Sequence, residues 1–169
     1  NAPVTRHGKG RRADKMLKAV NLLEHSAEEV FAVGAAESRP IEMVLDSGAC
    51  EHVMGNLEAP GYTVKPSIGS SRGAEFRAAN GERIANRGQL LLNLRTGKGK
   101  PLMSTFQVCD VAKPLWSVGR ICDNGYTVTF SAQGAVIRSE KSGQELVNVP
   151  RRNGLYIASL QLHKPEAAD

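Results

Sequence analysis

Aromatic residues are scarce in this chain: only 5% of its 169 residues are Phe, Trp or Tyr, whereas 41% are hydrophobic. A chain of this length can bury one core, which is therefore expected to be mostly aliphatic. Long hydrophobic runs are also missing, since none approaches the roughly 18 apolar residues of a membrane-spanning helix. The sequence does not open with a secretory signal either. We therefore expect an intracellular protein that has no membrane partner.

Cysteine is equally sparse, with only Cys50, Cys109 and Cys122 at wide spacing. Three cysteines do not make a disulfide framework, so free thiols are expected. Together with His52 they form a Cys₃His set that zinc accepts, but Cys109 and Cys122 lack the paired spacing of zinc ribbons. A cysteine peptidase is not favoured, because no third residue that orients an imidazole is identifiable. The sequence predicts no metal and no cofactor.

Positive charge is in excess, with a formal net charge of +5. Four basic residues without an acidic one lie in the first twelve positions: Arg6, Lys9, Arg11 and Arg12. We expect residues 1–12 to be a flexible basic tail, and such a tail favours proximity to nucleic acid.

The pattern between residues 13 and 37 is helical. Met16, Leu17, Val20 and Leu23 recur at three- and four-residue spacing, as on one face of a helix. We predict a helical extension or linker over 13–37, packed on the following domain or on a partner chain.

After Pro40 the pattern becomes typical of β-structure. Short apolar runs separated by Gly and Asn turns predict strands at 41–45, 103–108, 126–130, 135–137, 145–149 and 154–160, with a hairpin and a long strand within 76–94. Many short strands of this kind indicate a small barrel or sandwich. The predicted domain covers 38–160, and residues 161–169 form a C-terminal tail.

Residues 43–49 read Met-Val-Leu-Asp-Ser-Gly-Ala and are the most informative stretch. The apolar residues predict a buried strand, Gly48 permits a tight turn after it, and Ser47 supplies a hydroxyl at the turn. Asp46 is then held at the end of a strand, where a catalytic carboxylate needs to be. The alternative is an ordinary aspartate in a surface turn.

Two further blocks follow in the chain. One is Ala79-Asn80-Gly81, and the other runs from 115 to 119 (Leu-Trp-Ser-Val-Gly) and leads into Gly-Tyr-Thr-Val-Thr-Phe at 125–130. In order, the three blocks resemble the aspartic protease of copia-type retrotransposon polyproteins (pseudoviruses), a branch of the retropepsins. The resemblance covers residues 38–160.

The resemblance implies a small closed retropepsin-like β-barrel and an aspartic endopeptidase that processes a Gag-Pol polyprotein, in the cytoplasm or in virus-like particles. It assigns catalysis to Asp46, Ser47 and Gly48, a substrate-covering hairpin to Ala79, Asn80 and Gly81, and support of the active site to Ala49, Leu115, Val118 and Gly119. Without the resemblance, Asn80-Gly81 reads as a type I′ turn, and 115–119 reads as a core strand followed by a turn.

The chain holds only one Asp-[Ser/Thr]-Gly motif, because Asp110 and Asp123 are followed by other residues. Aspartic peptidases need two carboxylates that share a proton around one water. A second identical chain is therefore expected to supply the other Asp46 in a homodimer. The alternative is a catalytically silent or domesticated barrel that binds peptides or nucleic acid.

Overall fold

The computed structural model describes residues 38–166 and is mainly β, as predicted. The predicted basic tail (1–12) and helical extension (13–37) lie outside the described residues. No helix between residues 38 and 166 is long and apolar enough to cross a bilayer.

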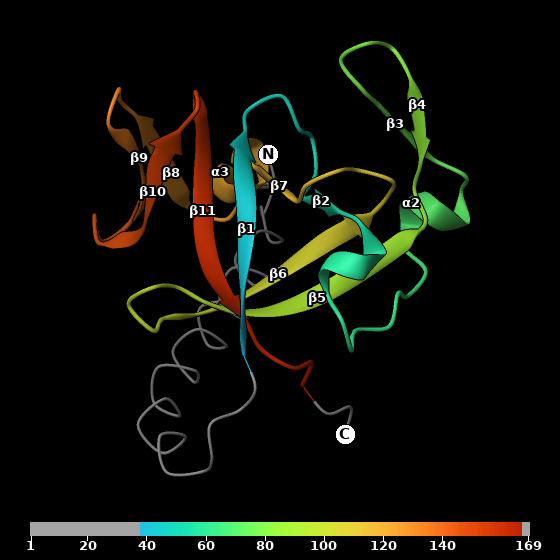
Figure 1. The fold of residues 1–169 in the computed structure, drawn as a ribbon, viewed down its shortest axis with the longest axis horizontal. Coiled ribbons are helices and arrows are strands. Elements are labelled where there is room, and N and C mark those ends of the chain that lie inside the picture. The colour runs from blue at the N-terminus through green and yellow to red at the C-terminus, as the bar shows by residue number, and fades with distance from the viewer. Residues whose placement is uncertain (1–37, 167–169) are drawn as a thin grey trace, which may run out of the picture. The chain divides into compact units, whose positions relative to one another are not determined.

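Six strands form a closed barrel (Figure 1). In order around the barrel they are β1 (Arg39–Asp46), β7 (Leu115–Ser117), β2 (Val53–Met54), β6 (Pro101–Val108), β5 (Gly88–Arg95) and β11 (Leu155–Leu162). The barrel closes because β11 pairs with both β5 and β1. The β1–β7 and β2–β6 pairs are parallel, and the other barrel pairs are antiparallel. The predicted closed barrel is thus confirmed.

Three more strands extend the sheet beyond β11, namely β10 (Glu145–Arg152), β9 (Gly134–Ser139) and β8 (Tyr126–Phe130). The hairpin predicted from 126–130 and 135–137 is present as the antiparallel β8–β9 pair. Strand β11 continues through Gln161 and Leu162, which pair with β5. The prediction that the C-terminal tail begins at 161 is therefore wrong: Leu162 is buried, and its apolar side chain keeps the strand in the barrel.

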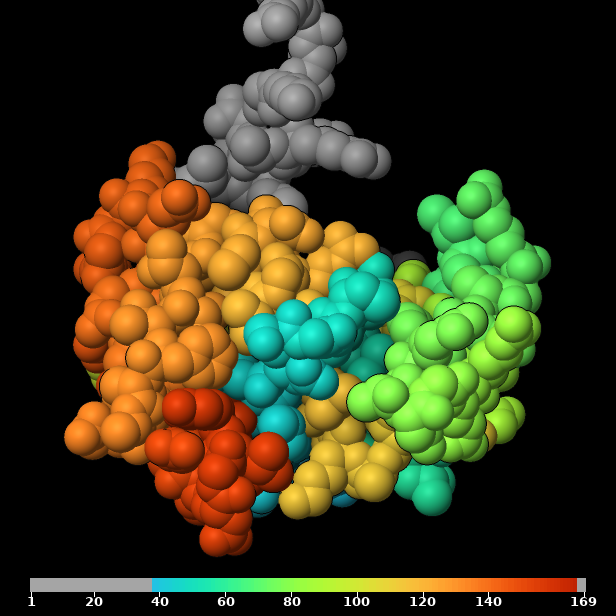
Figure 2. Space-filling view, turned by 90° about the horizontal axis from the view of Figure 1, so that it is seen from above, coloured from blue at the N-terminus to red at the C-terminus, as the bar shows by residue number. Residues whose placement is uncertain are grey.

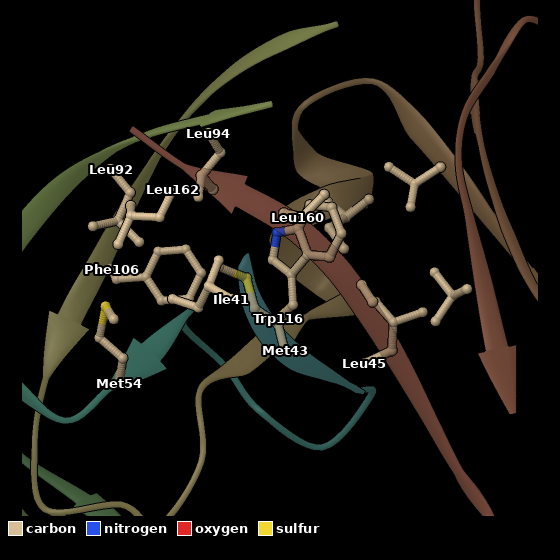
Figure 3. Packing of buried hydrophobic residues seen from close by; sticks show 14 of the residues in the cluster. Ile41, Met43, Leu45, Met54, Leu92, Leu94, Phe106, Trp116, Leu160 and Leu162 are labelled. Carbon is tan, nitrogen blue, oxygen red and sulfur yellow. The ribbon is translucent and has the colours of Figure 1, made fainter. Parts of the chain in front are cut away.

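The core fills the barrel with aliphatic side chains (Figure 3). In β5 the buried residues Leu90, Leu92 and Leu94 alternate with more exposed ones, as expected for a strand with one face inside. Only Phe106 and Trp116 contribute buried aromatic rings among the described residues. The scarcity of aromatics in the sequence is thus matched by an aliphatic core.

A small hairpin of β3 (Glu75–Arg77) and β4 (Arg83–Ala85) forms a sheet of its own. It follows the short helices η2 (Asn56–Glu58) and α2 (Ile68–Ser71) and projects from the barrel at the end where β1 finishes (Figure 1). Its turn is not the type I′ turn that Asn80-Gly81 suggests, because only Gly81 there has positive φ. Ala78 donates to Glu82 instead, which makes a three-residue loop ending in a left-handed glycine.

Candidate active site

Asp46 is the last residue of β1 and lies beside the end of β7. The parallel register of these strands places Val44 opposite Leu115 and Asp46 opposite Ser117. The inward-facing residues of β1 before it are buried, so the strand is anchored in the core. The carboxylate is consequently held at a fixed strand end, half-buried and at the edge of the barrel.

The turn after Asp46 is closed by its own carboxylate. The Gly48 N–H donates a hydrogen bond to Asp46 Oδ1 at 2.7 Å, and a Cβ at Gly48 would approach the same oxygen to 3.2 Å. Because glycine has no Cβ, the backbone N–H of residue 48 reaches the carboxylate without a close contact between a side chain and the carboxylate oxygen. Ser47 is exposed at the tip of the turn.

Ser117 forms hydrogen bonds to the rest of the loop that follows β1, residues 46–52 (the Asp46 loop). This fully buried residue donates its hydroxyl hydrogen to the carbonyl of Ala49 at 2.6 Å and accepts the Arg120 N–H at 3.2 Å. The second bond caps helix α3 (Val118–Asp123). One hydroxyl thus joins the Asp46 loop, the end of β7 and the start of α3.

His52 ends the same loop and is 6% exposed. Its Nδ1 accepts the Ser117 N–H at 3.0 Å, and its ring stacks on Phe106 with centroids 5.1 Å apart. Burial lowers the pKa of His52 from 6.5 to about 4, with a smaller opposing contribution from Glu51 and a further lowering by Arg120. The imidazole is therefore neutral near pH 7.

An ion pair joins the loop to helix α3. Arg120 of α3 binds both carboxylate oxygens of Glu51: its Nε lies 3.0 Å from Oε2, and its Nη2 makes a second, shorter contact with Oε1. This pairing raises the pKa of Arg120. A bidentate contact of this kind adds geometric definition between α3 and residue 51.

The structure brings two of the three sequence blocks together. Leu115 pairs with Val44 in β1 and with Val53 in β2. Val118 begins α3 and packs against the core, and Gly119 is exposed in the same turn, where a Cβ would be 3.8 Å from Ser117 Oγ. The predicted supporting residues therefore lie next to the Asp46 loop, although part of their block is a helix rather than a turn.

Ala79, Asn80 and Gly81 lie at the exposed tip of the β3–β4 hairpin. Figure 2 looks onto the barrel end, with the segment after β1 in cyan at the centre and the hairpin in green to one side. Within residues 38–166 no hydrogen bond joins the tip to the Asp46 loop; Asn80 Oδ1 accepts the Glu82 N–H within the hairpin itself.

The base of the hairpin is attached through Asn86. Its side chain donates to Gln107 of β6 at 2.9 Å and accepts the Gly88 N–H at 2.9 Å. Gly88 has a φ of +135°, and the Lys65 carbonyl lies 2.5 Å from where a Cβ would be. The hairpin thus leaves the barrel at a tightly packed point while its tip is in solvent.

The described part of the chain contains no cluster of three or more His, Cys, Asp or Glu suited to a metal ion. Its three cysteines are free; Cys50 and Cys122 are exposed, and burial raises the pKa of Cys109 to about 11. The Cys₃His arrangement considered from the sequence is therefore not assembled in residues 38–166.

No family model matches the chain, and no curated protein matches it.

Sequence reasoning did not assign a site role to Ser117, His52 or the Glu51–Arg120 pair. The sequence feature that could have identified Ser117 is that it is the single hydroxyl residue inside the apolar block 115–118. The feature that could have identified His52 is that a histidine begins an apolar segment. The ion pair joins residues 69 positions apart, and only the folded chain shows which charges meet.

Proposed function

We propose that this chain is one half of an aspartic endopeptidase of the retropepsin type, similar to the proteases of copia-type retrotransposon polyproteins. The observation that carries the proposal is the position of Asp46. Its carboxylate ends a core-anchored strand, accepts the Gly48 N–H at 2.7 Å and lies beside the buried Ser117. Acid–base catalysis requires a carboxylate fixed in this manner.

Peptide hydrolysis by this chemistry needs a second carboxylate next to the first. The chain has a single Asp-[Ser/Thr]-Gly motif, so the second Asp46 comes from an identical chain across a two-fold axis. Two carboxylates this close cannot both ionise at low cost, and they therefore share one proton.

The reaction then follows from the shared proton. The ionised carboxylate takes a proton from the water as its oxygen attacks the scissile carbonyl, while the protonated carboxylate donates to the carbonyl oxygen. The tetrahedral gem-diol then collapses: the C–N bond breaks as the carboxyl group that took the water proton passes it to the leaving nitrogen, and one gem-diol hydroxyl returns its proton to the other carboxylate, which re-forms the carbonyl and the singly protonated dyad. Ser47 orients the carboxylate, and Ala79, Asn80 and Gly81 cover an extended peptide.

The substrate class that the resemblance favours is the Gag-Pol polyprotein of a retrotransposon, processed in the cytoplasm or in virus-like particles. The basic residues 1–12 bring the enzyme near nucleic acid in such a particle. Two observations support this assignment: the closed six-stranded barrel, and the approach of the Asp46 and Leu115 blocks to each other.

A dilution series tests the two-chain mechanism. The 169-residue chain is assayed on a library of internally quenched peptides while its assembly state is followed by analytical ultracentrifugation. Specific activity should fall on dilution as dimers dissociate, and excess Asp46→Asn chain should inhibit by forming mixed dimers. Asp46→Asn alone should fold and dimerise but not cleave, since the amide keeps an oxygen for the Gly48 N–H.

Asp110→Asn is the matched control, because Asp110 is an exposed aspartate that pairs with Arg87. Constant activity per chain down to demonstrated monomer, without inhibition by the mutant, contradicts the two-chain mechanism. Cleavage that survives Asp46→Asn contradicts the aspartic mechanism as a whole. If the wild-type chain binds library peptides but cleaves none of them, it is the catalytically silent peptide-binding barrel and not a peptidase.

A further inference from the structure

His52 is a buried titratable group that the proposed chemistry does not use. It is 6% exposed and sits at the far end of the seven-residue stretch 46–52 that begins with Asp46. Because burial of its charged form is costly, the ring is neutral while it is buried.

Ser117 contacts this stretch at three points. It lies opposite Asp46 in the parallel β1–β7 register, its hydroxyl donates to the Ala49 carbonyl, and its N–H donates to His52 Nδ1 at 3.0 Å. The loop is thus tied at its start, middle and end to one residue that is itself fully buried.

The third contact depends on protonation. Nδ1 accepts a hydrogen bond only while its lone pair is free, and an imidazolium would direct an N–H at the Ser117 N–H. The charged groups acting on His52 are Glu51, next to it in the loop, and Arg120 of α3, and they act in opposite directions. Phe106 of β6 and Ser117 of β7, which contact the ring, carry no charge.

We propose that His52 is a positioning residue that fixes the Asp46 loop to Ser117 while its ring is neutral, and that acid releases the loop by protonating it. The effect on catalysis rests on the proposed function above. The acid-sensitive contact itself does not, since it is a property of the folded chain.

The direction of the pH effect follows from the two states of the ring. With the loop closed, burial lowers the pKa of His52 to about 4, whereas a released ring titrates near its ordinary 6.5. Above pH 6.5 both states are neutral and the contact contributes fully. Between pH 6.5 and 4 only the released ring gains a proton, so the released population rises by about 30-fold between pH 7.5 and 5.

Amide hydrogen exchange on the wild-type chain measures this population directly. The protection factor of the Ser117 amide, corrected for intrinsic exchange, should fall by about 30-fold between pH 7.5 and 5. The Thr96 amide, which donates to the Lys100 carbonyl in the β5–β6 connection, is the internal reference and should change little. Ser117 protection that tracks Thr96 over this range overturns the proposal.

Two matched variants extend the test to activity. His52→Asn places an amide oxygen near the position of Nδ1, so that it still accepts the Ser117 N–H but does not titrate. His163→Asn is the control, since burial also lowers the pKa of His163, which lies beyond β11. His52→Asn should lose the pH dependence of Ser117 protection and move the acid limb of cleavage to lower pH, whereas His163→Asn should do neither.

The outcomes separate this inference from the proposed function. An acid limb unchanged in His52→Asn overturns the positioning role in catalysis. Failure of the wild-type chain to cleave any peptide contradicts the proposed function, and the Ser117 exchange data still decide whether the acid-sensitive contact exists.

Discussion

The hydroxyl of Ser117 donates a hydrogen bond to the backbone carbonyl of Ala49, 68 residues earlier in the chain, at 2.6 Å. This bond joins two of the three blocks that carry the resemblance to copia-type proteases. The side chain that connects strand β7 of the barrel to the Asp46 loop is therefore that of Ser117. Gly119, to which the resemblance assigns support of the active site, has no side chain to make such a bond.

Ser117→Ala should therefore destabilise the fold by about 1–3 kcal/mol, because the Ala49 carbonyl and the Arg120 N–H both lose a buried partner. If the proposed function holds, cleavage should fall by more than the loss of folded protein explains. Urea unfolding and peptide cleavage measure the two effects. Ser159→Ala on the exposed face of β11 is the control, and equal stability of the two variants would contradict the role of Ser117.

Gly88→Ala should destabilise the hairpin base by about 2–5 kcal/mol. The residue has a φ of +135°, and the new methyl group would lie 2.5 Å from the Lys65 carbonyl and 2.7 Å from Val64 Cγ1. Thermal unfolding compares it with Gly97→Ala, where no atom lies within 4 Å of the added Cβ. Equal unfolding midpoints for the two variants would show that the close approach at Gly88 does not constrain the fold.

The strands were predictable where the local pattern is strong. Alternation and apolar runs identified β1, β6, β8, β9 and β10 because each strand carries its own signal in consecutive residues. The two-residue strand β2 and the six-residue helix α3 were not predicted. Elements that short are stabilised by what they pack against, and a single sequence does not contain that information.

The same limit applies to the candidate site. Asp46 and its glycine are neighbours in sequence, so their turn could be anticipated. The contact of His52 with Ser117 joins residues 65 positions apart through a ring nitrogen and a backbone amide, and no spacing rule indicates it. The type of the hairpin turn could not be predicted either, because Asn-Gly suits both a type I′ turn and a three-residue loop, and the pairing of Ala78 with Glu82 decides between them.

Glu51 and Arg120 offer a test of how much the ion pair at the loop contributes. Their side chains are 31% and 45% exposed, so solvent screens the attraction and the coupling free energy should be only about 0.5–1 kcal/mol. A double-mutant cycle of Glu51→Gln and Arg120→Met at low salt measures it, and 1 M NaCl should reduce it. Arg87 with Asp110, a more exposed pair, is the control cycle and should give less. A coupling above about 2 kcal/mol would mean that the pair is effectively desolvated.

The final prediction concerns the pH profile and the metal requirement of cleavage. A dyad is competent only when singly protonated, so kcat/KM should follow a bell on the acidic to neutral side, in which the alkaline limb belongs to the pair and the acid limb combines the pair with the protonation of His52. EDTA should change neither the bell nor the unfolding midpoint, because the proposed reaction uses no metal. The measurement is kcat/KM from pH 3.5 to 8.5 with and without chelator, on wild type and on His52→Asn, so that the contribution of His52 to the acid limb is separated from that of the dyad. A rate that keeps rising into the alkaline range indicates a thiolate or metal-bound hydroxide as nucleophile, and it would contradict the assignment of Asp46 as the catalytic carboxylate.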